Sequence, residues 1–254
     1  MRFLTSTRAL ENLKTCYISY CSGCKLIIFF ALPFNWSIFV SSSPFDLIRS
    51  DVWWLSHVAT KEGSQYYVFF IDDHSRYCWV YLMKHRSKFF EIYTTFWALI
   101  KTQHSVIIKF FIFNLNWEYT SNKFYELHVL DGTIHQTSYS YTSEQNRVTK
   151  RKHRHIVKTT RSFLLSASIL SELWGEVVLT TVILIIIIQF YYILDFSLYK
   201  NLYGYTPDYF SFRAFDCTYF VLHPHIERNK LSSRSVICVF IIYGEGKRGI
   251  VVLI

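Results

Sequence analysis

The chain has 254 residues and a mass of 30.3 kDa, which is enough for one large domain or two small ones with an apolar core. Hydrophobic residues make up 51% and charged residues only 18%, so the composition excludes a disordered chain and is unusually apolar for a soluble enzyme. The 27 Lys and Arg against 18 Asp and Glu give a formal charge of +9, which suits a polyanion or an anionic membrane surface as partner.

The N-terminal region contains a cysteine pair at a spacing that metal sites use. Cys21 and Cys24 form a C-x-x-C pair, but a zinc site needs two more ligands and no histidine precedes His57. We therefore expect an incomplete zinc site. The first residues lack the cationic end and apolar block of a secretory signal, so we expect free thiols in a reducing compartment.

The order of the predicted elements is that of an α/β protein. An irregular region ends in the serine cluster Ser41 to Ser43, where a domain boundary fits. Apolar periodicity then predicts strands at 47–55, 65–72, 76–83, 107–113 and 133–138, and helices at 87–101, 119–132 and 144–170. We expect Ser87 to cap the first helix. This pattern predicts a mixed sheet with helices packed against it, followed by a small β unit in the tail.

The helix predicted from Glu144 is basic. Such a charge run is ordinarily a solvated helix face, and the alternative is a surface that contacts nucleic acid. The cationic residues at issue are Lys150, Arg151, Lys152, Arg154, Lys158 and Arg161.

Residues 177–194 are almost uniformly apolar and just reach the length of a membrane span. Acidic Glu172, Glu176 and Asp195 flank this segment in place of cationic anchors. We therefore expect a buried helix rather than a membrane span.

Several short segments together carry a family resemblance. They are SSSPFDLIRSDVW, FIDDHSRYCWVYLMKHRSKFF, IHQTSYSYTSEQNRV, KRKHRH, LWGEVVLT, PDYFSFRAFDC and RNKLSSRSVICVFIIYGEGKRG. In this order and at this spacing they resemble the copia-type integrase of retrotransposons, from about residue 20 to residue 254. The resemblance implies a zinc-module remnant at 1–43, an RNase H-like catalytic core with a five-stranded mixed sheet at 44–210, and an SH3-like β region at 211–254. It also implies DNA and further copies of the chain as partners, and a nuclear or cytoplasmic location.

The chemistry of this family is DNA integration, in which three carboxylates hold two magnesium or manganese ions. The resemblance places the first carboxylate on Asp51. The second position is Asn114 in place of Asp, and the third is Lys150 in place of Glu, with the family's thirty-five residues between them. Glu118 and Glu144 are displaced along the chain, so we expect neither to substitute. The resemblance therefore predicts that the fold persists and that metal binding and catalysis are lost.

Three functional interpretations follow. The first is an inactive relative of a DNA-integrating polynucleotidyl transferase. The second is a nucleic-acid binder that uses the basic helix, Lys150 to Arg161, and the net positive charge without catalysis. The third is a membrane-associated protein built around residues 177–194. In addition, Asp216 stands where the family has a glycine, and a Cβ at a positive φ would destabilise the tail.

Overall fold

The computed structural model describes residues 41–53, 57–114, 122–138, 147–188, 197–223, 231, 233–243 and 250–253. The chain divides into two compact units, Met1–Ile38 and Phe39–Ile254, and the described residues all belong to the second. Cys21 and Cys24 lie outside the described residues, so the incomplete zinc site stays a prediction. The expected domain boundaries stay predictions as well.

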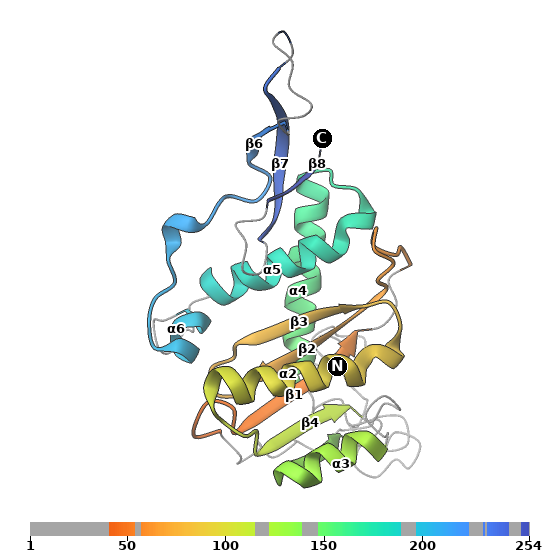
Figure 1. Ribbon diagram of the computed structural model, residues 1–254, viewed down its shortest axis with the longest axis vertical. Helices are drawn as coiled ribbons and strands as arrows, with labels where there is room; N and C mark the ends of the chain where they lie inside the picture. The colour runs from red at the N-terminus through yellow and green to blue at the C-terminus, as the bar shows by residue number, and fades with distance from the viewer. Residues whose placement is uncertain are drawn as a thin grey trace, which may run out of the picture. The chain divides into compact units, whose positions relative to one another are not determined.

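A five-stranded mixed sheet forms the centre of the second unit (Figure 1). Its strands lie in the order β3-β2-β1-β4-β5, with β1 antiparallel to β2, β2 antiparallel to β3, and parallel pairing of β1 with β4 and of β4 with β5. The strands are β1 (Leu47–Trp53), β2 (Tyr66–Asp72), β3 (Cys78–Met83), β4 (Phe110–Asn114) and β5 (Ile134–Ser138). The mixed sheet predicted from the sequence is thus confirmed.

Helices cover both faces of this sheet. On one face, α2 (Phe89–His104) and α3 (Asn122–Asp131) pack with β-strand residues such as Phe70 and Phe111. On the other face, α4 (Arg147–Ser166) and α5 (Trp174–Ile188) pack with residues such as Phe69 and Ile71. Because successive side chains of a strand point to opposite faces, β2 is apolar along nearly its whole length and buried on both sides.

The start of α2 differs from the prediction. A 3-10 turn, η3 (Arg86–Lys88), leads into the helix, and the N-cap residue is Lys88 with no side-chain hydrogen bond. The proposed cap by Ser87 was wrong, because this residue lies within the preceding turn. Strand β4 also begins later than predicted, since Ile107 is half exposed before the chain enters the sheet.

The two adjacent carboxylates after the second predicted strand have structural partners. Buried Asp72 accepts hydrogen bonds from the backbone N–H of Phe45 and from both the N–H and the hydroxyl of Ser75, which closes the β2–β3 turn. Asp73 forms ion pairs with Arg49, at 2.8 Å, and with Arg76, at 3.1 Å. These contacts explain the acidic pair without a catalytic role.

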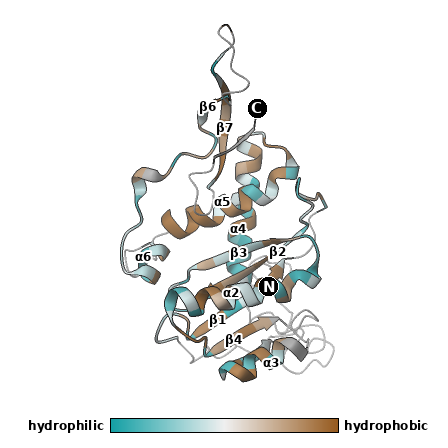
Figure 2. Ribbon diagram, in the orientation of Figure 1, coloured by the Kyte–Doolittle hydropathy of each residue, from teal (hydrophilic) through white to brown (hydrophobic). Residues whose placement is uncertain are grey.

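Helix α5 and the short turn η5 before it (Ser171–Leu173) form the apolar segment in question. Ser171–Ile188 is long and apolar enough to cross a membrane by length and composition alone, and 61% of it is buried within the protein. The helix is hydrophobic over most of its length (Figure 2) and packs against β3, α4 and the C-terminal sheet. The expected packing of this helix against protein is therefore confirmed for the described part.

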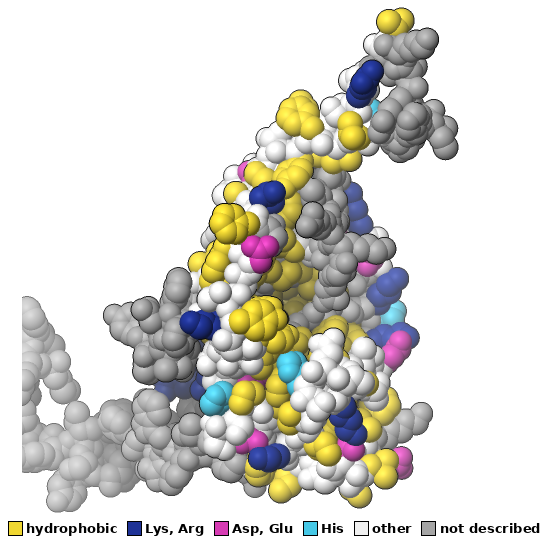
Figure 3. All heavy atoms as spheres, turned by 60° about the vertical axis from the view of Figure 1, so that its left-hand side comes forward, with side chains coloured by type: hydrophobic (Ala, Val, Ile, Leu, Met, Phe, Trp, Pro, Cys, Tyr) yellow, Lys and Arg dark blue, Asp and Glu magenta, His cyan; other side chains and the backbone are white. Residues whose placement is uncertain are grey.

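The C-terminal part begins with α6 (Leu198–Tyr203) and the turn η6 (Tyr209–Ser211) and ends in a three-stranded antiparallel sheet. The strands of this sheet are β6 (Thr218–Leu222), β7 (Ser235–Tyr243) and β8 (Ile250–Leu253). A β unit is as predicted, while its SH3-like character stays a prediction. Hydrophobic side chains are exposed on the face that carries α6 and the segment after it (Figure 3), and Phe210 is 92% exposed.

Asp216 has a φ of +66°, in the left-handed region that favours glycine. Its backbone N–H donates to the carbonyl of Phe240 in β7, which holds the turn before β6 in place. The family's glycine implied a positive φ at this position, and Asp216 has one. Because Asp216 carries a Cβ, this conformation is strained.

Candidate active site and nucleic-acid interface

The first two positions of the expected metal site lie on neighbouring strands. In the parallel pairing of β1 and β4, Ser50 is the partner of Phe113, so the register continues to Asp51 and Asn114. Asp51 is the partner of Phe69 in β2, which belongs to the core under α4 and α5. Because Phe113 belongs to the opposite core, position 114 falls on the α4 side as well. The fold thus places both positions next to each other on one face.

The third position is on the helix that covers this face. Lys150 lies in the first turns of α4, directly after Thr149, which is fully buried. Helix α4 contacts β1, and Lys150 itself is exposed. The register and the helix therefore bring the three positions to the same region of the molecule.

These three residues differ chemically from a site for two divalent ions. Magnesium and manganese prefer several negatively charged oxygen ligands. Asp51 supplies one carboxylate, an asparagine supplies at most a neutral amide oxygen, and the ammonium of Lys150 has only hydrogen-bond donors. Among the described residues, no group of three His, Cys, Asp or Glu side chains is placed to hold a metal ion. The three side chains at these positions do not fit a two-metal site.

An aromatic wall that sequence analysis missed lies near Asp51, on the face of β1 and β2 that α4 covers. The rings of Trp53 and Tyr67 stack with centroids 5.1 Å apart, and His153 of α4 lies 5.7 Å from Trp53 and 5.9 Å from Tyr67. Burial is the main cause that raises the pKa of Tyr67 well above its usual value, and the negative charge of Asp51 is the second cause. Burial lowers the pKa of His153 to about 4, so this imidazole is neutral at physiological pH.

Helix α4 has a buried side and a basic side. Thr149, Ile156 and Thr160 are buried, and the hydroxyl of Thr160 donates to that of Thr181 in α5 at 3.2 Å. The remaining surface is cationic. The exposed basic residues are Arg147, Lys150, Arg151, Arg154, Lys158 and Arg161, whereas Lys152 is half-buried.

The cationic residues of α4 form a stripe, which we call the basic stripe and define as Arg147, Arg151, Arg154, Lys158 and Arg161. These residues follow one another at spacings of three or four, so they lie along one side of the helix. Of the predicted nucleic-acid contacts, Arg151, Arg154, Lys158 and Arg161 thus share one exposed side, and Lys152 lies beside it.

Relatives of the chain are transposon polyproteins from plants. The chain is 34% identical over 230 residues to the retrovirus-related Pol polyprotein from transposon RE1 of Arabidopsis thaliana, a match that covers 88% of the chain and 15% of the relative. It is 31% identical over 207 residues to the polyprotein from transposon TNT 1-94 of Nicotiana tabacum, covering 80% of the chain and again 15% of the relative. The chain therefore spans only 15% of the length of these relatives. No protein-family model matches it.

Solved structures resemble the fold. A chain of the simian T-cell lymphotropic virus intasome in complex with the PP2A regulatory subunit B56 gamma has a TM-score of 0.54 at 12% identity, over 81% of this chain and 72% of that one. The HTLV-2 integrase catalytic core domain in complex with magnesium, in its trimeric form, has a TM-score of 0.48 at 13% identity, over 63% of this chain and 97% of that one. The protein belongs to the copia-type, retrovirus-related Pol polyproteins, of which it is an integrase-like segment with an α/β core.

Proposed function

We propose that this integrase-like chain binds DNA through α4 and does not catalyse strand transfer. The loss of catalysis is inferred from the placement of Asn114 beside Asp51 in adjoining strands, with Lys150 on the covering helix. A family site supplies three carboxylates in this region, whereas Asp51, Asn114 and Lys150 together carry no net charge. The attraction that assembles a pair of divalent cations is therefore cancelled.

The proposal of DNA binding depends on the charge pattern of α4. The helix contains no acidic residue, so the basic stripe has no i,i+4 partner of opposite sign within the helix. An ordinary solvated face alternates both signs, because like charges at this spacing destabilise a helix. Phosphates of a nucleic acid would relieve the repulsion and release counterions. The arrangement thus favours nucleic-acid contact over a merely solvated face.

Strand transfer with purified protein tests the catalytic part. The assay compares the natural chain with Asn114→Asp/Lys150→Glu, in magnesium and in manganese, on a labelled duplex. We expect no product from the natural chain. Product that depends on the metal ion and on Asp51 in the natural chain would contradict the proposal, whatever the restored variant does.

Salt dependence tests the binding part. We expect the DNA affinity to fall linearly on a logarithmic scale with salt. Removing one cationic contact, as in Lys158→Met or Arg161→Met, should lower the slope of this plot by about 0.9. Asp51→Ala is the matched control and should leave the affinity unchanged, because no metal ion bridges Asp51 to DNA. Salt-independent binding, or no binding at low salt, would contradict this part.

The same family reasoning suggests self-association and a nuclear or cytoplasmic location. The HTLV-2 integrase core is described in trimeric and dimeric forms. Light scattering of the purified chain tests self-association. Microscopy of a tagged chain tests the location, and accumulation in the secretory pathway would contradict the proposal.

A further inference from the structure

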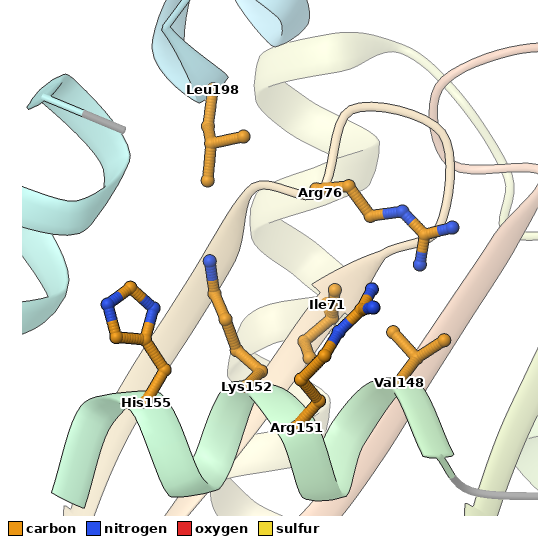
Figure 4. A pocket seen from close by; sticks show the side chains of 7 residues that line it. All are labelled: Ile71, Arg76, Val148, Arg151, Lys152, His155 and Leu198. Atoms are coloured by element: carbon orange, nitrogen blue, oxygen red, sulfur yellow. The ribbon is translucent and has the colours of Figure 1, made fainter. Parts of the chain in front are cut away.

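A pocket of about 230 Å³ lies between α4 and the turn that joins β2 to β3 (Figure 4). Four of its lining residues are basic, namely Arg76 from the turn and Arg151, Lys152 and His155 from α4. The others are apolar and come from β2, α4 and α6. Figure 4 shows the α4 side chains rising toward the turn and Arg76 reaching over them from the other side. None of the three positions of the expected metal site lines this pocket.

Within the part of the chain that the structure describes, the positive charge of the pocket is only partly compensated. Asp73 forms an ion pair with Arg76 but shares it with Arg49. The neighbouring Asp72 is engaged by hydrogen bonds from Phe45 and Ser75. Within the described residues, neither Arg151 nor Lys152 forms an ion pair, and no acidic residue lines the pocket.

The position of Lys152 makes this arrangement costly without a ligand. Burial, with smaller contributions from Arg76 and Arg151, lowers the pKa of the Lys152 ammonium, and only the buried thiol of Cys78 opposes the shift. Two of the cations, Arg151 and Lys152, lie in the second turn of α4, toward the end of the helix where the dipole is positive. Three mutually repelling cations around one cavity are an arrangement that a bound anion stabilises.

We propose that this pocket binds a single phosphate group, held by Arg76, Arg151 and Lys152. Arginine presents planar pairs of N–H donors and lysine a compact ammonium, and together they suit the anionic oxygens of a phosphate group, whether it is a backbone phosphodiester or free phosphate. The volume admits a phosphate group with some water, since one liquid water occupies about 30 Å³. His155 at the rim adds a further nitrogen.

The structure favours a nucleic acid as the source of the phosphate. Arg151 belongs both to the pocket and to the basic stripe, so a strand that follows the stripe reaches the pocket at its N-terminal end. The inference that the phosphate belongs to a nucleic acid rests on the proposed DNA binding, whereas the inference of a phosphate site does not. Free inorganic phosphate is the other molecule that could supply the phosphate group.

Equilibrium unfolding of the full chain in increasing inorganic phosphate, with potassium chloride at matched ionic strength, tests the site. A specific site gives a saturable rise of the unfolding midpoint, whereas general salting-out by phosphate gives a rise that does not saturate. We expect Lys152→Met, which keeps the apolar stem, to weaken phosphate at least tenfold. Lys152→Arg should retain binding. Arg161→Met removes a cation of the same helix outside the pocket; it is the matched control for charge and should keep the phosphate response of the natural chain, although its DNA binding is weakened.

A duplex oligonucleotide distinguishes the two sources. If Lys152→Met weakens DNA binding more than Arg161→Met does, the pocket takes a backbone phosphate as proposed. If phosphate binding is lost in Lys152→Met while DNA affinity is unchanged, the pocket is a free-phosphate site and the nucleic-acid source is wrong. If the natural chain binds no DNA but keeps the saturable phosphate effect, the proposed function fails and the pocket stands. No saturable effect in the natural chain, or an equal one in Lys152→Met, overturns the phosphate site.

Discussion

Acid should destabilise this protein through buried histidines with lowered pKa values, and His128 of α3 is the one whose contribution can be isolated. Its ring is 1% exposed and packs on Phe124, 4.3 Å between centroids, and stacks on Trp97, 5.6 Å between centroids. Its Nε2 shares a hydrogen bond with the hydroxyl of Tyr93, and its Nδ1 has no partner among the described residues. Burial, with His135 adding and Asp131 opposing, lowers the pKa of His128 to about 4.

The sign and size of the effect follow from proton linkage. His128 takes up its proton near pH 6.5 in the unfolded chain and only near pH 4 in the folded protein. As the pH falls from 6.5 toward 4, the unfolded chain therefore binds more protons than the folded protein, and the free energy of unfolding decreases. Above pH 6.5 the ring is neutral in both states and this loss is absent. Between pH 7.5 and pH 5 we expect this group alone to remove about 2 kcal/mol from the free energy of unfolding.

Urea unfolding at pH 7.5 and pH 5 measures this loss, with His128→Phe as the comparison. Phenylalanine keeps the aromatic packing and does not titrate, and the hydroxyl of Tyr93 loses its partner at both pH values, so that cost cancels. The natural chain should lose about 2 kcal/mol more than the variant. Equal losses in the two proteins would refute the reasoning.

Three substitutions test other contacts. Gly175→Ala should lower the free energy of unfolding by about 1–3 kcal/mol, because its Cβ would lie 2.7 Å from a methyl carbon of buried Thr60; an unchanged urea midpoint would contradict this packing. Asp216→Gly should raise it by about 0.5–1 kcal/mol by relieving the positive φ, and a loss of stability would show that the Asp216 side chain has a compensating role. Asp73→Asn should lower it by about 3–5 kcal/mol, because Arg49 is only 7% exposed and would lose its counter-ion; a loss below about 1 kcal/mol would mean that water solvates Arg49.

The sequence predicted the central sheet because the strands have clear signals. Aromatic and β-branched runs separated by polar turns mark β1 to β3, and helical spacing of apolar residues marks α2. Local signals did not predict how α2 begins. Ser87 has the chemistry of an N-cap, but the chain tightens into a 3-10 turn there, and only the path from β3 into the helix decides this.

The candidate site was predictable in part. The spacing and wording of the family motifs point to Asp51, Asn114 and Lys150, and the β1–β4 register places the first two on neighbouring strands. The aromatic wall of Tyr67 and His153 was not predictable, since the period of two in β2 does not say which face α4 will cover. The basic pocket was missed for a related reason, because Arg76 and Lys152 are far apart in the sequence and meet only through the packing of α4 on the turn.

Helix α5 is shared by two cores, and this has a consequence for how the protein unfolds. Its Val178 and Val182 pack under the five-stranded sheet, while Val177 packs with Ile241 of the C-terminal sheet and the hydroxyl of Thr180 donates to the carbonyl of Ile241. Loss of the C-terminal strands would therefore strip one side of a nearly uncharged helix and present it to solvent. We expect the two sheets to melt in one cooperative transition, and a protease cut near residue 211 to lead to aggregation rather than to a stable shortened core.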